Sequence, residues 1–151
     1  VKVAVVERHQ GTGNVACGFL KGYGIKAGAV ALSIAHDSHN IIVVGVSDEE
    51  MEFAVNSLIA QEGGMVLVRE GKVLESMPMP IAGLMSDQSG EWVDEKLTAI
   101  HAKAYEELGI AGDVEPVMTL CFMSLAVIPE VKLTDMGLFD VTTFSFIPVE
   151  A

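Results

Sequence analysis

The chain is built from short, strongly apolar runs separated by polar segments that contain glycine. Residues 28–34 and 41–46 are two such runs, rich in β-branched residues and almost free of charge. Runs of this length and composition are typical of strands that are buried on both faces of a sheet. Residues 1–8 show the same pattern, so we expect them to form a strand inside the sheet rather than at its edge.

Two segments carry helical periodicity. Ser47 and Glu50 match a capping box, apolar residues then recur on one face, and Gly63 ends the pattern. We interpret the acidic first turn of this segment as capping and solvation, because negative charge suits the positive end of a helix dipole. A second long helix is predicted over residues 91–108 by the same spacing of apolar positions.

The shorter elements have less uniform patterns. Glu70 and Gly71 separate two apolar runs and predict a tight hairpin over residues 65–77. Residues 116–127 fit a buried strand and a buried helical segment equally well. We further expect a short helix over residues 15–21 and a closing strand over residues 142–147.

These elements alternate along the chain and predict a mixed fold, α/β or α+β. We expect one domain over residues 1–151, with a mixed sheet of about five or more strands covered by two long helices. A TIM barrel is excluded, because that fold needs about 250 residues and this chain has 151.

Charge and hydropathy exclude several classes of partner. The chain carries nine Lys and Arg against twenty-one Asp and Glu, a net charge of −12, which argues against a surface that follows nucleic-acid phosphates. Its apolar runs are too short for a membrane span. Cys17 and Cys121 lie in apolar surroundings, and we expect buried, reduced thiols in a cytoplasmic protein. A disulfide or a pair of metal ligands is the alternative.

The candidate chemistry lies between the two buried runs, at residues 35–40. It comprises His36, Asp37, Ser38, His39 and Asn40. A connection this polar between such apolar strands is expected at a sheet end, where side chains converge on a ligand.

Three interpretations of this segment stay open. His36 and His39, with Asp37 between them, supply ligands for Zn, Mn or Fe, and His9 is the best candidate for a further ligand. Alternatively, the segment recognises a polar substrate through hydrogen bonds. In the third interpretation Asp37, Ser38 and Asn40 only stabilise a turn.

The same residues belong to a longer pattern that resembles a known family. It comprises Ala35–Gly45, Arg8-His9 with Gly13, Phe19 with Lys21-Gly22-Tyr23-Gly24, Pro80–Ser86, Met118-Thr119-Leu120 and Ile128–Leu138. This pattern resembles the C-terminal domain of the microbial adenine deaminases of the amidohydrolase superfamily.

The resemblance implies a parent enzyme that hydrolyses adenine to hypoxanthine and ammonia with a metal-activated water in a (β/α)₈ barrel. The divalent metal, Mn, Fe or Zn, then belongs to that barrel, since its ligand motifs are missing from this chain. We therefore expect a C-terminal domain that is inactive alone, with residues 36–40, and His9 beside them, facing the barrel mouth. The implied partners are adenine and the catalytic barrel.

Further expectations follow from this interpretation. Purine salvage in the cytoplasm is the implied process, and apolar surface left by the missing barrel predicts self-association into a homo-oligomer. The alternative from another class is a stand-alone module for oligomerisation, or for binding a metal or a small ligand, without catalysis.

Overall fold

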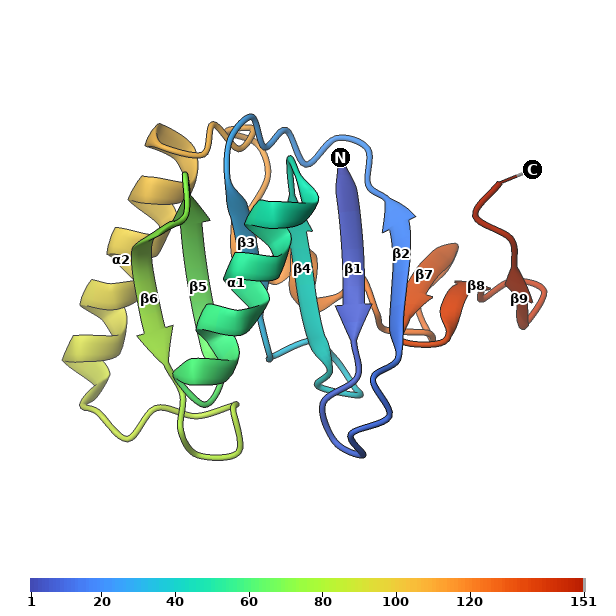
Figure 1. Cartoon of the computed structure of the whole chain (residues 1–151), viewed down its shortest axis with the longest axis horizontal. Coiled ribbons are helices and arrows are strands. Elements are labelled where there is room, and N and C mark those ends of the chain that lie inside the picture. Colours follow the sequence, from blue (N-terminus) through green and yellow to red (C-terminus); the bar gives the residue numbers. More distant parts are fainter. Residues whose placement is uncertain (151) are drawn as a thin grey trace.

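The computed structural model describes residues 1–150 and contains a six-stranded sheet in the order β2-β1-β4-β3-β5-β6 (Figure 1). All five neighbouring strand pairs are antiparallel. The strands are β1 (Lys2–Val6), β2 (Val15–Phe19), β3 (Ala29–Leu32), β4 (Ile41–Gly45), β5 (Gly64–Arg69) and β6 (Lys72–Pro78). The expected α and β fold with a sheet of this size is confirmed, and β1 lies inside the sheet as predicted. The sheet itself is antiparallel throughout, whereas a mixed sheet was expected.

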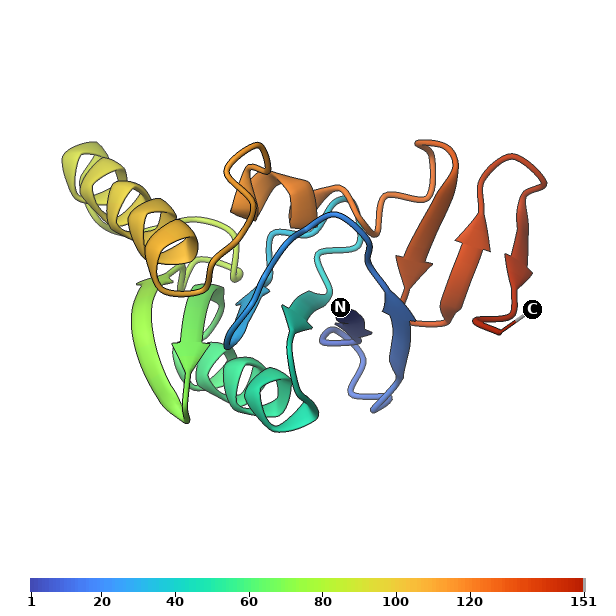
Figure 2. The same cartoon turned by 90° about the horizontal axis from the view of Figure 1, so that it is seen from above.

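The two long helices lie on opposite faces of this sheet (Figure 2). Helix α1 (Asp48–Ala60) packs on β3, β4 and β5, and helix α2 (Gly90–Glu106) packs on β6 and β5. Strands β3 and β4 are buried along their whole length. They lack the alternation usual in antiparallel strands because both of their faces are covered.

The start of α1 and the predicted hairpin are joined by one contact. The Ser47 hydroxyl accepts a hydrogen bond from the Glu50 backbone N–H (3.2 Å), as the capping pattern predicts. The Glu50 carboxylate accepts from the backbone N–H of Glu70 (2.5 Å), in the β5–β6 turn. Glu70 and Gly71 both have positive φ, 52° and 67°, which suits a tight two-residue hairpin.

One predicted element is wrong. Residues 15–21 do not form a helix, because β2 pairs with β1 from Val15 to Phe19. The segment is short and mostly exposed, so pairing with a distant strand decides its structure.

The ambiguous segment 116–127 begins as the short helix α3 (Pro116–Cys121) and continues as turns. The Glu115 side chain caps this helix by accepting from Met118 N, and Pro116 occupies its first turn. The helical alternative is therefore correct for its first half.

A second, three-stranded antiparallel sheet follows, formed by β7 (Val131–Thr134), β8 (Gly137–Asp140) and β9 (Ser145–Ile147). A strand was expected over residues 142–147, and only residues 145–147 form one, as β9. The small sheet contacts β2 at Gly18, where an added Cβ would lie 3.4 Å from Leu138 and 3.7 Å from Leu133. It extends from one side of the main sheet (Figure 2).

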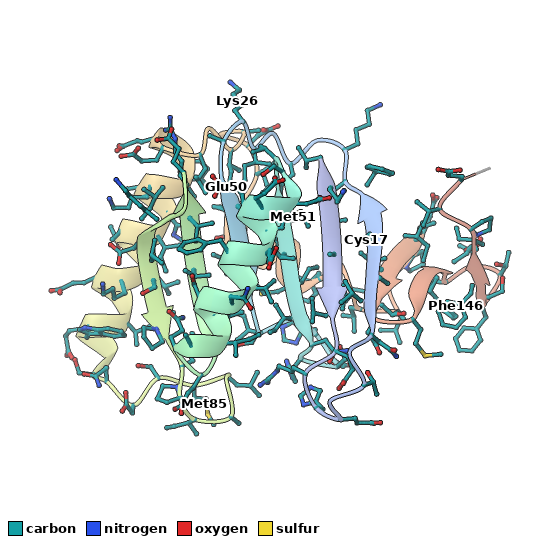
Figure 3. All side chains as sticks on the ribbon, viewed as in Figure 1. Cys17, Lys26, Glu50, Met51, Met85 and Phe146 are labelled. Atoms are coloured by element: carbon teal, nitrogen blue, oxygen red, sulfur yellow. The ribbon has the colours of Figure 1, made fainter. Side chains whose placement is uncertain are left out.

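The two cysteines differ in exposure. Cys121 is buried as expected, whereas Cys17 is exposed, and both thiols are free. Cys17 lies on β2, outside the part of the sheet that α1 covers (Figure 3). The expectation of a buried Cys17 is therefore wrong. Over residues 1–150, no helix has the length and hydropathy needed to cross a membrane.

Candidate functional site

The polar segment connects β3 to β4 at one end of the main sheet, the lower edge in Figure 1. The sequence predicts this position, because a polar connection cannot lie inside a layered core. Asp37 and Ser38 are exposed, His36 and His39 are half-buried, and Asn40 is buried. We call residues 36–40 the polar loop.

Arg8 ties the polar loop to two other connections at this edge. Its backbone N–H donates to Asn40 Oδ1 (3.3 Å), and its Nε donates to the backbone carbonyl of His39. A terminal guanidinium nitrogen donates to the carbonyl of Ala82 (2.9 Å), in the β6–α2 connection. Sequence reasoning noted Arg8 only within the family pattern and missed this role. The available signal was a cation two residues after a buried strand, in a chain with few cations.

His9 lies against the same loop, and its Nε2 donates to the Ser38 carbonyl (2.6 Å). The β1–β2 connection that carries His9 is organised around the carboxylate of Glu7. That carboxylate accepts from Thr12 N (3.1 Å) and Gln10 N (2.7 Å). These bonds, the one from Thr12 above all, lower the pKa of Glu7 to about 2. The connection is therefore held by its own hydrogen bonds.

His36 is fixed by the segment around the end of α3. Its backbone N–H donates to the Cys121 carbonyl (2.8 Å), and its carbonyl accepts from Ser124 Oγ (3.2 Å). The imidazole stacks on Phe122, with ring centroids 5.0 Å apart and an interplanar angle of 28°. Neither Phe122 nor Ser124 was a sequence candidate, because both lie more than 80 residues away in the chain.

His39 lies beside His36, with ring centroids 5.7 Å apart in an edge-on arrangement. Burial lowers the pKa of His39 below its ordinary value, and the neighbouring His36 and Arg8 act in the same direction. Its Nδ1 is buried and has no hydrogen-bond partner among residues 1–150. Burial thus favours the neutral form of the ring, and Nδ1 is left without a partner in the described part of the chain.

The turn interpretation accounts for only part of the loop. Ser38 Oγ accepts from Asn40 N (3.4 Å), and Asn40 Oδ1 accepts from Arg8, so these two side chains stabilise backbone. Asp37 is exposed and takes part in no hydrogen bond with the described residues. Its carboxylate therefore has no structural partner in the loop.

The residues present do not form a metal centre by themselves. Within the described part of the chain, no three His, Cys, Asp or Glu residues are grouped so that they would hold a metal ion. His9 already uses Nε2 on the Ser38 carbonyl. Burial raises the pKa of Cys121 to about 11, so its thiol stays protonated at neutral pH. Metal ligation by His36 and His39 stays a prediction.

The fourth histidine belongs to a different contact. His101 Nε2 pairs with the Glu115 carboxylate, joining α2 to the start of α3. It takes no part in the hydrogen bonds that hold the polar loop, and it serves as a matched control for variants there.

A cavity of about 380 Å³ lies between the polar loop and the small sheet. Asp37 and Ser38 form part of its wall, and Phe139 and Phe146 from the small sheet form another part. Pockets of this size with mainly apolar walls and a few polar groups are typical binding surfaces.

Comparisons with a family model and with curated proteins all point to the same family. Residues 1–145 match the family model described as the adenine deaminase C-terminal domain. The chain is 75% identical over 151 residues to adenine deaminase 2 of Desulfotalea psychrophila, covering 100% of this chain and 26% of that protein. It is 54% identical over 149 residues to the adenine deaminase of Nitratidesulfovibrio vulgaris strain DP4, covering 99% and 26%. It is 52% identical over 147 residues to the adenine deaminase of Halalkalibacterium halodurans, covering 97% and 25%.

The chain thus spans about a quarter of the length of the curated relatives it matches. The family resemblance seen in the polar loop and its neighbours extends over nearly all of the chain. This chain belongs to the adenine deaminase C-terminal domain family.

Proposed function

We propose that this chain is the C-terminal domain of an enzyme that hydrolyses adenine to hypoxanthine and ammonia. In that reaction the bond from the ring carbon to the exocyclic nitrogen breaks, a water oxygen takes its place, and ammonia leaves. The proposal is supported by relatives that are named adenine deaminases and are about four times as long as this chain. The activity belongs to the whole parent polypeptide, and we expect residues 1–151 to be inactive alone.

Within that enzyme, the polar loop closes the active site over adenine. The observation that carries this proposal is the convergence of His36 and His39 with an unpaired Asp37 at one sheet end. Arg8, Cys121 and Ser124 fix the backbone of the loop. A site held this firmly is suited to binding, because little ordering is left to occur when a ligand arrives.

The loop offers groups that match adenine. The Asp37 carboxylate is an acceptor for the exocyclic amine, and a neutral imidazole is both donor and acceptor for ring nitrogens. His39, with its lowered pKa, is neutral at neutral pH and able to take up a proton and pass it on. We assign the loop the roles of orienting adenine and carrying protons toward the leaving ammonia.

A divalent metal, Mn, Fe or Zn, belongs in this proposal to the parent barrel. It would lower the pKa of a bound water so that hydroxide is available near neutral pH. Over residues 1–150, no three His, Cys, Asp or Glu side chains are grouped so that they would hold it. The steps that we assign to the polar loop are hydrogen bonding and proton transfer by its own side chains.

The activity itself is tested with the full-length parent protein and with residues 1–151 alone. Conversion of adenine to hypoxanthine is followed by absorbance, and ammonia and bound metal are measured on the same samples. We expect turnover by the full-length protein and none by the isolated chain. Turnover by the isolated chain, or no deamination by a metal-loaded full-length protein, would overturn the proposal. Either result would favour the stand-alone module or another reaction.

The same proposal includes purine salvage in the cytoplasm as the process and place of the parent enzyme. It also includes self-association of residues 1–151 into a homo-oligomer, through apolar surface that the barrel would cover in the parent. Sedimentation of the isolated chain over a range of concentrations tests that part separately from the activity.

A further inference from the structure

The small sheet presents an aromatic surface to the cavity beside the polar loop. Leu133 and Leu138 pair across β7 and β8 on the face that meets β2 at Gly18. Phe139 follows Leu138 on β8 and pairs with Phe146 on β9. Because successive residues of a strand point to opposite faces, both Phe side chains lie on the other face of the small sheet. Their rings lie edge to face with centroids 5.3 Å apart. One face of the small sheet thus anchors it, and the other is left open.

This open surface is unusually exposed for side chains of its kind. Phe144, in the β8–β9 turn, is 78% exposed, and Phe146 is 52% exposed. Met136 and Val127 beside them are 71% and 70% exposed. We call these four residues and Phe139 the aromatic face; its Phe146 is labelled on the small sheet in Figure 3. Contiguous exposed apolar residues of this kind mark interaction surfaces.

A second copy of this chain is a poor match for the aromatic face. Asp37 and Asp135 line the same cavity, and the whole chain carries a net charge of −12. A symmetric contact would bring these carboxylates close to their own copies, and like charges across an interface oppose association.

Two observations point instead to the remainder of the parent polypeptide. The relatives carry about three quarters of their length outside the region matched by this chain. The aromatic face is also continuous with Asp37 and Ser38, which line the same cavity and belong to the polar loop. A body that meets the polar loop therefore reaches the aromatic face as well.

We propose that the aromatic face is the docking surface by which this domain is seated on the part of its parent polypeptide outside this chain. The proposal rests on the proposed function, since it assumes a longer parent whose active site meets the polar loop. The matching surface on the parent is apolar at its centre and carries Lys or Arg opposite Asp135, which leaves the Asp37 carboxylate to adenine. Docking there fixes the position of the polar loop relative to the barrel.

Methionine oxidation tests this docking in the full-length protein. Met136 lies in the aromatic face, while Met118 on α3, 48% exposed, lies outside it and serves as the internal control. The protein is treated with hydrogen peroxide, and sulfoxide at each position is measured by peptide mass spectrometry. Each rate is divided by the rate for the same protein unfolded in urea. Docking predicts that Met136 oxidises about tenfold more slowly than Met118, as for a surface covered nine-tenths of the time.

Paired variants separate docking from a general effect of lost aromatic surface. Phe144→Ser together with Phe146→Ser is expected to restore rapid oxidation of Met136. Phe19→Ser, a change at an equally exposed aromatic residue on β2, 75% exposed, leaves Met136 protected. If Met136 oxidises as fast as Met118 in the unchanged full-length protein, the proposal is wrong. Protection that disappears on dilution to the monomer would overturn it in favour of a second copy.

The result is independent of the activity of the polar loop. If Met136 is protected but His36→Ala leaves turnover unchanged, docking is supported and the loop makes no catalytic contribution. If Met136 is oxidised rapidly but His36→Ala slows turnover, docking is overturned and the proposal for the polar loop stands.

Discussion

Arg8 donates a hydrogen bond from its Nε to the backbone carbonyl of His39, across 31 positions of sequence. This bond joins the β1–β2 connection to the polar loop, and the bond from the same guanidinium to Ala82 adds the β6–α2 connection. Three segments far apart in the chain are thus held at one sheet end by a single side chain.

Replacing Arg8 should destabilise the protein. Hydrogen bonds from a charged donor contribute about 1.5–3 kcal/mol each when buried, and less here because Arg8 is partly exposed, so we expect Arg8→Ala to lower the free energy of unfolding by about 1–3 kcal/mol. Arg8→Lys should recover only part of this, because an ammonium group lacks the fork of donors. Urea unfolding, with exposed Lys21→Ala as the control, measures the change. Equal stability of the Arg8→Ala and Lys21→Ala variants would show that the bonds contribute nothing.

Ser33 makes a second, more deeply buried link at this edge. It is 1% exposed, donates to the Gly83 carbonyl (2.6 Å) and accepts from Gly64 N (2.8 Å). Ser33→Ala leaves both backbone groups buried and unpaired, which should lower the free energy of unfolding by about 1–3 kcal/mol. The same measurement on exposed Ser145→Ala should show a change within about 0.5 kcal/mol. A loss for Ser33→Ala no larger than that of the control would contradict this assignment.

The β1–β2 connection should keep its structure at unusually low pH. The pKa of Glu7 is lowered from 4.5 to about 2, chiefly by the hydrogen bond from Thr12. A carboxyl whose pKa is lower in the folded state than in the unfolded state stabilises the folded state at any pH above the unfolded-state pKa. This stabilisation is lost as the pH falls toward the folded-state pKa, here about 2. The amide resonance of Thr12, followed by NMR between pH 6 and pH 1.5, should shift with a midpoint near 2, and Glu7→Gln should abolish that shift. A midpoint near 4.5 would mean that these bonds do not form in solution.

The two thiols should react at very different rates. Cys17 is exposed, whereas Cys121 is buried with its pKa raised to about 11 by burial. A disulfide reagent should therefore modify one thiol quickly in the native protein and the second only after unfolding. Cys17→Ser should remove the fast reaction. Fast modification of both thiols in the native protein would contradict the packing of Cys121 against the polar loop.

The sequence predicts best those elements that are determined by neighbouring residues. The Ser47 cap, the Glu70-Gly71 turn and the burial of β3 and β4 all follow from local pattern, and all are confirmed. Pro116, preceded by Glu115, was an available signal for α3, because proline is favoured in the first helical turn.

The remaining features depend on contacts between distant residues. Strand β2 forms because it pairs with β1, and its own short, glycine-containing sequence does not distinguish a strand from a helix. In the site, the five residues of the polar loop were predicted together, but the residues that hold them were not. Phe122 stacks on His36 from 86 positions away, and no local pattern signals such a contact.

The central claim is that the polar loop takes part in adenine deamination by the parent enzyme. The most direct test is kcat/KM for adenine in full-length His36→Ala, His39→Ala and Asp37→Asn variants, with His101→Ala as the matched control. Loss of one hydrogen bond to a bound substrate costs about 1.5–3 kcal/mol when a charged group is involved, so we predict a fall of at least about tenfold. Metal content should stay unchanged in all four variants, and the control should retain full activity. Wild-type kcat/KM in all three loop variants would contradict the claim.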